Sequence, residues 1–146
     1  MHHSLSGIII LKMSPHGYEE FAHPADLALK VWGEDFYSVL QNASEGMAAL
    51  MGVRYDPSKN IEESFTIRRG SQEEMLVDFL GEVLFLLEDK RITLSAFEIT
   101  LGKETMITGV FHPLISVDRW IKAVTFHNLI IIQFPDRLET TITFDV

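Results

Sequence analysis

The chain has 146 residues, of which 47% are hydrophobic and 23% are charged, values typical of one globular domain with a substantial core. Its formal net charge of −9, from 12 basic and 21 acidic residues, argues against a surface that binds nucleic acid directly. The absence of cysteine excludes disulfides, thiolate zinc sites and thiol nucleophiles, so any metal must be one that takes carboxylate, imidazole or carbonyl ligands, as calcium, magnesium and manganese do.

The N-terminal segment carries no recognisable targeting signal. The apolar run from Gly7 to Leu11 is too short for the core of a signal peptide, and no stretch reaches the roughly 18 apolar residues of a membrane span. We therefore expect a cytoplasmic protein without membrane contact. Met13 offers an alternative start, so residues 1–14 are predicted to be a disordered leader or an over-extended start, followed by a single domain over 15–146.

The next part of the chain predicts two short strands and a helix. Residues 18–32 read as two strands broken around His23-Pro24, because proline cannot donate to a strand ladder and biases the residue before it to extended geometry. From Asp35 to Met51 the apolar residues follow helical spacing, and Gly52 predicts the end of that helix.

A strand over residues 61–69 and a second helix are predicted next. Ser71 and Glu74 have the spacing of a capping box, in which each side chain bonds a free backbone N–H at the helix start. The helix is expected to end near Lys90. Its wide apolar face consists of Met75, Leu76, Phe79, Leu80, Val83, Leu84 and Leu87.

From Thr93 onward the pattern predicts strands. The expected strands are 94–101, 105–111, 120–126, 129–134 and 140–145. Gly102-Lys103 and Pro135-Asp136 indicate turns, and His112, beside Pro113, is expected in a surface loop. Two helices placed early against a largely antiparallel sheet predict an α+β domain of two layers.

A candidate functional segment lies where the second predicted strand begins. Asp26 follows a Pro-Ala step at the mouth of this strand, and His23 lies three residues before it. Asp26 is either a turn or capping residue or part of a site at the end of the sheet, where functional groups often lie. The interruption by Pro24 favours the second interpretation.

The C-terminal end is a second candidate segment. Alternation places Thr141, Thr143 and Asp145 on the face of the strand opposite Ile142 and Phe144. Asp145 adjoins the terminal carboxylate of Val146, and two such charges repel unless a cation, a lysine or a proton neutralises them. If the sheet holds the terminus in place, the pair predicts a chelate for a hard cation; the alternative is a solvated strand end.

Lys122 and His127 belong to a third segment. Lys122 interrupts an apolar run, either as a guard of an edge strand or as the countercharge to the two aspartates, and the second interpretation is favoured. His127 would face away from Lys122 in an uninterrupted strand, so a bend at residues 126–128 would be needed to bring both to one site.

The ordered set of these segments resembles the archease family over about residues 18–146. The motifs that carry the resemblance are His23-Pro24-Ala25-Asp26, Leu76-Val77-Asp78-Phe79-Leu80, Lys122-Ala123-Val124-Thr125-Phe126-His127 and Phe144-Asp145-Val146. Each motif alone is weak evidence for the family, whereas the order of the motifs and the matching C-terminal segment make the whole set more specific.

The resemblance implies an archease-like fold and an accessory role rather than an enzyme. Archeases promote guanylylation and multiple turnover of the GTP-dependent RNA-splicing ligase that joins tRNA halves, so this ligase is the expected partner. The implied metal site uses Asp26 and Asp145, with Lys122 nearby and His23 and His127 beside it. The expected ion is calcium, with magnesium or manganese as alternatives.

Three other functions stay open. The aspartates, with His23 or His127 to activate water, could serve a stand-alone metal-dependent phosphohydrolase. The chain could also be a chaperone-like modulator of an RNA methyltransferase, or an interaction module whose carboxylates are structural. The sequence has no phosphate-binding glycine loop, zinc-protease motif or serine nucleophile elbow, and it leaves the oligomeric state open.

Overall fold

The computed structural model describes residues 9–13, 17–22 and 27–146. The elements in this part of the chain are β1 (Ile9–Met13), β2 (Tyr18–Ala22), β3 (Leu27–Gly33), α1 (Phe36–Met51), β4 (Arg54–Tyr55), β5 (Ile61–Ile67), α2 (Gln72–Asp89), β6 (Ile92–Leu101), β7 (Thr105–Ser116), β8 (Ala123–Thr125), β9 (Ile132–Gln133) and β10 (Leu138–Asp145). The expected α+β class is confirmed.

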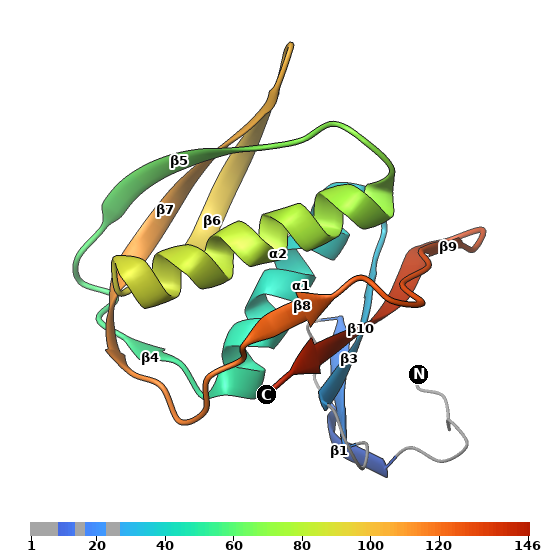
Figure 1. Ribbon diagram of the computed structural model, residues 1–146, viewed down its shortest axis with the longest axis horizontal. Coiled ribbons are helices and arrows are strands. Elements are labelled where there is room, and N and C mark those ends of the chain that lie inside the picture. The colour runs from blue at the N-terminus through green and yellow to red at the C-terminus, as the bar shows by residue number, and fades with distance from the viewer. Residues whose placement is uncertain (1–8, 14–16, 23–26) are drawn as a thin grey trace.

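The strands form two antiparallel sheets rather than one (Figure 1). The first sheet has the order β1-β2-β3-β10-β8, with β9 also paired to β10. The second sheet has the order β4-β7-β5, with β6 on the other side of β7. The last strand of the chain, β10, therefore lies inside the first sheet beside β3, far from it in sequence.

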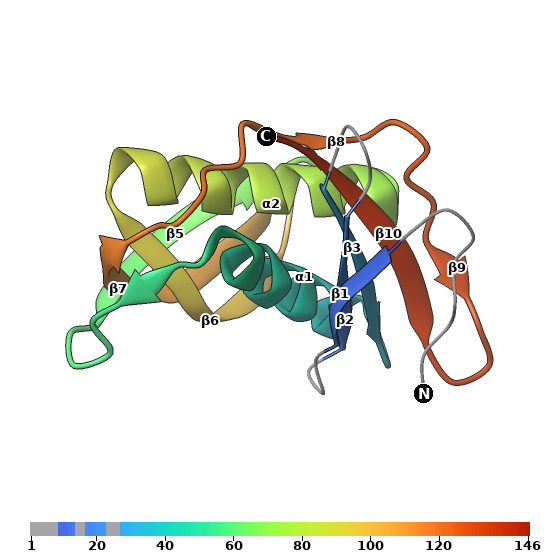
Figure 2. The ribbon, with the colours of Figure 1, turned by 90° about the horizontal axis from the view of Figure 1, so that it is seen from below.

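One hydrophobic core joins both sheets and both helices. Leu29 and Phe144 from the first sheet and Phe97 and Ile107 from the second belong to the same buried cluster as the apolar faces of α1 and α2. Figure 2 shows α1 and α2 at the middle of the molecule, with the strands of the two sheets to either side. This arrangement fixes the first sheet, and with it the C-terminal strand, to the rest of the domain.

Helix α1 begins and ends where the sequence predicts. Asp35 is the N-cap, and its carboxylate accepts the backbone N–H of Ser38 at 2.8 Å. This bond holds the pKa of Asp35 below its usual value of 3.8. Gly52 ends the helix in the left-handed region, at φ 66°, which other residues adopt only with strain.

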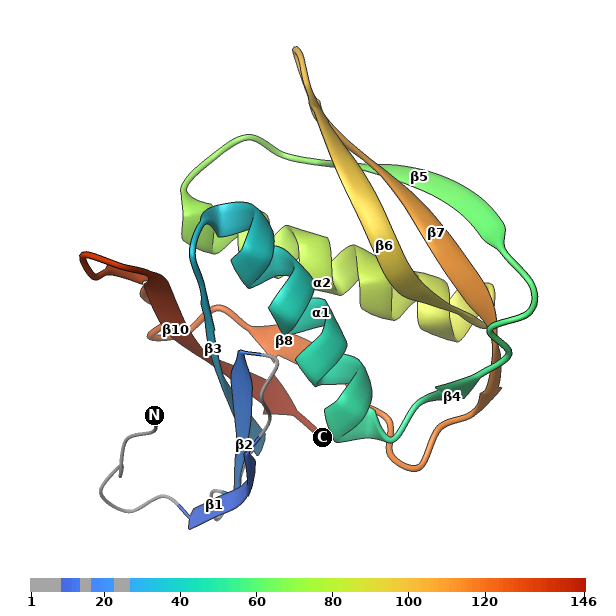
Figure 3. The same cartoon turned by 180° about the vertical axis from the view of Figure 1, so that it is seen from behind.

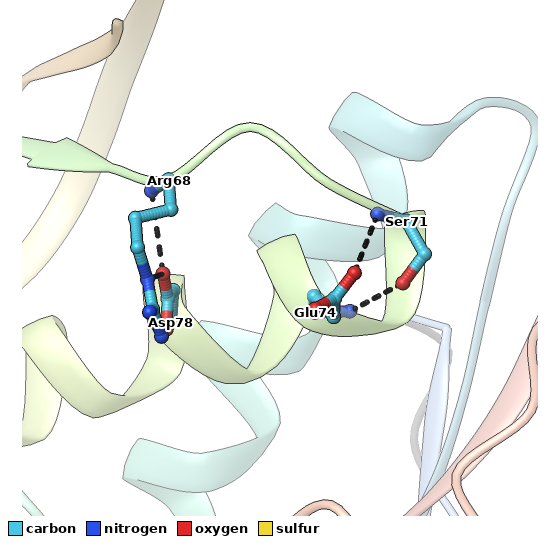
Figure 4. Close-up of polar contacts among 4 residues, drawn as sticks. All are labelled: Arg68, Ser71, Glu74 and Asp78. Carbon is cyan, nitrogen blue, oxygen red and sulfur yellow. Dashed lines mark hydrogen bonds and ion pairs between the residues drawn. The ribbon is translucent and has the colours of Figure 1, made fainter.

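Helix α2 begins with the predicted capping box (Figure 4). The Ser71 hydroxyl accepts the backbone N–H of Glu74 at 3.1 Å, and the Glu74 carboxylate accepts the backbone N–H of Ser71 at 3.0 Å. The bond from the Ser71 backbone lowers the pKa of Glu74 below its usual 4.5, with a smaller contribution from the Ser71 side chain. The box satisfies two of the backbone donors that a helix start leaves free.

Replacing Ser71 by alanine is expected to lower the free energy of unfolding by about 1 kcal/mol, because one backbone N–H loses its acceptor. A carboxyl with a lowered pKa in the folded state stabilises the fold above its unfolded pKa and loses this contribution as pH falls through the folded pKa. The backbone N–H of residue 71, which is the main cause of the lowered pKa of Glu74, remains in Ser71→Ala, so the loss should be nearly the same at neutral pH and in acid. Urea denaturation at both pH values measures it, and Ser71→Asp, which restores a cap acceptor, should recover most of it.

Several strand boundaries differ from the prediction. The expected strand 120–126 is ordered as a strand only over Ala123–Thr125, and 129–134 only over Ile132–Gln133. Both short strands pair with β10 and with no other described strand. The reason is a turn at His127-Asn128, where Asn128 has φ 59° and the Leu129 N–H donates to the Phe126 carbonyl at 3.1 Å.

The prediction of a surface loop at His112 is wrong. Strand β7 continues through His112 and Pro113 to Ser116, and the His112 side chain is buried. Its Nδ1 lies 2.8 Å from the carbonyl oxygen of Lys59, and its ring stacks on Tyr55 of β4. Pro113 is compatible with this strand because Pro113 accepts through its carbonyl, from the N–H of Asp56 at 2.9 Å, and has no N–H to satisfy.

Candidate functional site

Strand β10 holds the C-terminal end of the chain between two neighbours. Phe144 pairs with Leu27 of β3 on one side and with Val124 of β8 on the other. The predicted alternation is confirmed, since Ile142 and Phe144 are fully buried whereas Asp145 is exposed. The Asp145 backbone is therefore held by the sheet while its carboxylate is free to meet a ligand.

The structure brings two of the predicted site segments together. Asp145 pairs with Ala123, and the N–H of Lys122 donates to the carbonyl oxygen of Asp145 at 2.8 Å. Both side chains are exposed, and the described part of the chain shows no ion pair between the Lys122 ammonium and the Asp145 carboxylate. Because Asp26 lies outside the described residues, the role of Lys122 as a countercharge stays a prediction. Lys122 precedes β8, the strand beside β10, and its side chain is exposed.

Asp26 and His23 lie outside the described residues. Leu27, the residue that follows Asp26 in the sequence, pairs with Phe144, the residue that precedes Asp145. Within the described part of the chain, no three His, Cys, Asp or Glu residues gather closely enough to hold a metal ion. Because the predicted site depends on Asp26, this absence does not test it.

His127 lies in the turn that follows β8. The bend that the sequence required at residues 126–128 is present, and the His127 side chain is exposed. Among the described residues, no hydrogen bond or ion pair joins His127 to Lys122 or Asp145. Its place beside the site stays a prediction.

The end of β10 offers oxygen donors at an exposed edge with apolar neighbours. Val146, which follows Asp145, and Phe126, which follows β8, are both about half exposed. A hydrated carboxylate can take up a hard cation, and exposed apolar side chains around it suit contact with another protein. The described residues supply neither a nucleophile with an adjacent base nor a closed pocket at this edge.

A group of buried charges in the first sheet escaped the sequence analysis. Lys30 and Glu19 are register partners and only 6% and 1% exposed, and both carboxylate oxygens of Glu19 are buried without a hydrogen bond. The Lys30 ammonium lies 3.9 Å from the Glu139 carboxylate, which also pairs with Arg137. Alternation along β3 does not reveal this burial, because a single sequence gives no signal that both faces of the strand are covered.

The comparisons with known proteins point to one family. The model of the archease protein family matches residues 18–146. A protein archease from Methanosarcina barkeri is 26% identical over 146 aligned residues, which cover 92% of this chain and all of that protein. Another from Methanosarcina mazei is 26% identical over 122 residues, covering 77% of this chain and 84% of its own length.

Two solved structures share the fold. The crystal structure of an archease from Thermotoga maritima, described as a possible chaperone, superposes with a TM-score of 0.68 at 21% identity and covers 99% of this chain and all of its own. The solution structure of protein 1598 from Methanobacterium thermoautotrophicum gives a TM-score of 0.63 at 24% identity, over 90% and 99% of the two chains. In the described residues, neither helix combines the length and apolar character that crossing a membrane requires.

Proposed function

Because this chain is a member of the archease family, we propose that it is a cytoplasmic accessory protein of the GTP-dependent RNA-splicing ligase. It promotes guanylylation of the ligase and its multiple turnover, and has no catalytic centre of its own. The ligase, rather than this chain, contacts the RNA, since 12 basic residues are outnumbered by 21 acidic ones.

The observation that carries the proposal is the juxtaposition of Lys122 and Asp145. The backbone bond of 2.8 Å between them joins two motifs that lie more than twenty residues apart and that both belong to the resemblance. The fully buried Phe144 holds this junction against the core. A small acidic domain with an exposed carboxylate and ammonium at one edge can approach the active site of a larger basic partner.

The donor chemistry of this edge fits a hard divalent cation. Asp145 is an exposed carboxylate, and oxygen ligands of this kind are those that calcium and magnesium take. Asp26, Asp145 and the carboxylate of Val146 would hold the ion, with calcium favoured and magnesium or manganese as alternatives. Such an ion supplies positive charge next to phosphate groups, while Lys122 provides a second, permanent positive charge at the same edge.

The test is single-turnover guanylylation of the RNA-splicing ligase from the same organism, with and without this protein. Wild-type protein should raise the rate, whereas Asp26→Ala and Asp145→Ala should reduce the stimulation to near the level without protein. Asp136→Ala provides a matched control, because Asp136 is an exposed aspartate in the turn before β10, away from Lys122. Circular dichroism establishes that all variants are folded.

Stimulation that persists in both folded variants would contradict the metal role, and no stimulation by wild-type protein would contradict the accessory role itself. Thermal denaturation with calcium and with chelator tests cation binding independently of the ligase, because an ion bound only by the native state must raise stability. Phosphate release from nucleotides by the purified protein, lost in Asp26→Ala, would instead favour the hydrolase. Stimulation of an RNA methyltransferase in place of the ligase would favour the chaperone-like role.

A further inference from the structure

A cavity lies between α1 and the start of β6. Its volume is about 280 Å³, and four elements line it: β2, α1, β4 and β6. Figure 3 shows α1 running between β2 and β6, with β4 near its C-terminal end. Neither Asp145 nor Lys122 lines this cavity, so it is separate from the candidate site above.

Two largely buried residues with hydroxyl groups line the cavity. Ser44 of α1 is 6% exposed and Thr93 of β6 is 5% exposed, and both line the cavity. Their hydroxyl groups can both donate and accept hydrogen bonds at the wall of the cavity.

Further polar side chains converge on the same space from both walls. Gln41 and Ser44 lie one helical turn apart and therefore on one face of α1. The pairing of β6 with β7 shifts register between Leu94 and Ala96, a β-bulge that places Ser95 among the lining residues. Bulges of this kind occur often beside binding sites, where they redirect a side chain.

Aromatic rings form the rest of the lining. Tyr18 and Phe97 are buried, and both line the cavity. Tyr55 lies at its rim, where the ring is held by stacking on His112 with 5.2 Å between centroids. Rings held in this way offer flat apolar surfaces beside the hydroxyl groups, and their positions are fixed before a ligand arrives.

The charges around the cavity restrict the class of ligand. Among the described lining residues Glu45 is the single charged one, and none is Lys, Arg or His. A phosphate or carboxylate group would meet no countercharge there, in a chain whose net charge is already −9. We propose that this cavity binds an uncharged small molecule with several hydroxyl groups and a flat or apolar face, the chemistry that nucleosides and glycosides share.

The proposal is tested by ligand-detected NMR on the full chain, followed by titration of any ligand that shows transfer. Guanosine, adenosine and methyl glucoside are the probes, and guanosine 5′-monophosphate tests the charge argument. At least one uncharged probe should bind, and the monophosphate should bind about tenfold more weakly than guanosine or not at all. The two classes of probe distinguish a nucleoside from a glycoside site.

Ala48→Leu fills the cavity from α1 and should weaken binding by about tenfold or more. Ala96→Leu is the matched control, because Ala96 is exposed next to the bulge but does not line the cavity. If Ala48→Leu fails to fold, Ser95→Leu obstructs the other wall at an exposed position. Binding of no uncharged probe, equal binding of the monophosphate, or unchanged affinity in the folded cavity variant would each overturn the proposal.

Discussion

Replacing Phe144 by alanine should lower the free energy of unfolding by about 3–5 kcal/mol, a large fraction of the stability of an ordinary domain. Phe144 is 0% exposed and belongs to the core that joins both sheets and both helices. Alanine would leave a cavity in the core beneath β10, which β3 and β8 flank at this position. Urea denaturation followed by circular dichroism measures the change.

The matched control is Phe126→Ala, in the segment that follows β8. Phe126 is 50% exposed, so its removal should change the free energy of unfolding by less than about 1 kcal/mol. Under conditions in which Phe144→Ala remains folded, the proposed stimulation of the ligase should be weaker for Phe144→Ala than for wild type, because the backbone next to Asp145 is no longer held. Equal losses of stability in the two variants would show that the end of β10 is not anchored by the core.

Two glycines within helices should respond to alanine with opposite signs. A Cβ at Gly46 of α1 would lie 2.7 Å from Leu29 Cδ2 and 2.9 Å from Tyr18 Cγ, so the helix or the sheet must move. We expect Gly46→Ala to destabilise the protein by about 1–3 kcal/mol through overpacking. A Cβ at Gly81 of α2 meets no atom within 4 Å, so Gly81→Ala should stabilise it by about 0.5–1 kcal/mol through helix propensity.

Thermal denaturation and urea titration of the two variants test this pair directly. The substitution and its effect on the unfolded chain are the same in both helices, so the difference isolates the packing of α1 against β2 and β3. A stabilising effect of Gly46→Ala would contradict the close approach of α1 to the first sheet. A destabilising effect of Gly81→Ala would contradict the open space above α2.

Features that depend on neighbouring residues in the chain could be predicted from the sequence. Both helices and their caps at Asp35, Gly52 and Ser71 follow from side chains that bond to backbone groups within one turn. The alternation in β10, with Phe144 inside and Asp145 outside, follows from the period of a strand. The α+β class rests on the same local signals, and the family resemblance on the order of the motifs.

Features that depend on contacts between distant segments were decided by the tertiary structure. The division into two sheets, the burial of Lys30 and Glu19, and the place of His112 in β7 depend on which strands pair and on what covers them. Residues 120–134 read as two strands, but the turn at His127-Asn128 leaves only short segments paired with β10. Sequence periodicity contains no information on strand partners.

The candidate site divides in the same way. The sequence by itself selected Asp26, Lys122, His127 and Asp145 as the residues able to hold or neutralise charge, because their chemistry is visible in any context. The pairing of β8 with β10 makes Lys122 and Asp145 neighbours. This pairing depends on the tertiary structure, because the packing of the core decides which strand edge is available to β8. Burial of Phe144 fixes the register of β10 in the first sheet. Removing the Phe144 ring from water stabilises only the register that places this ring in the core.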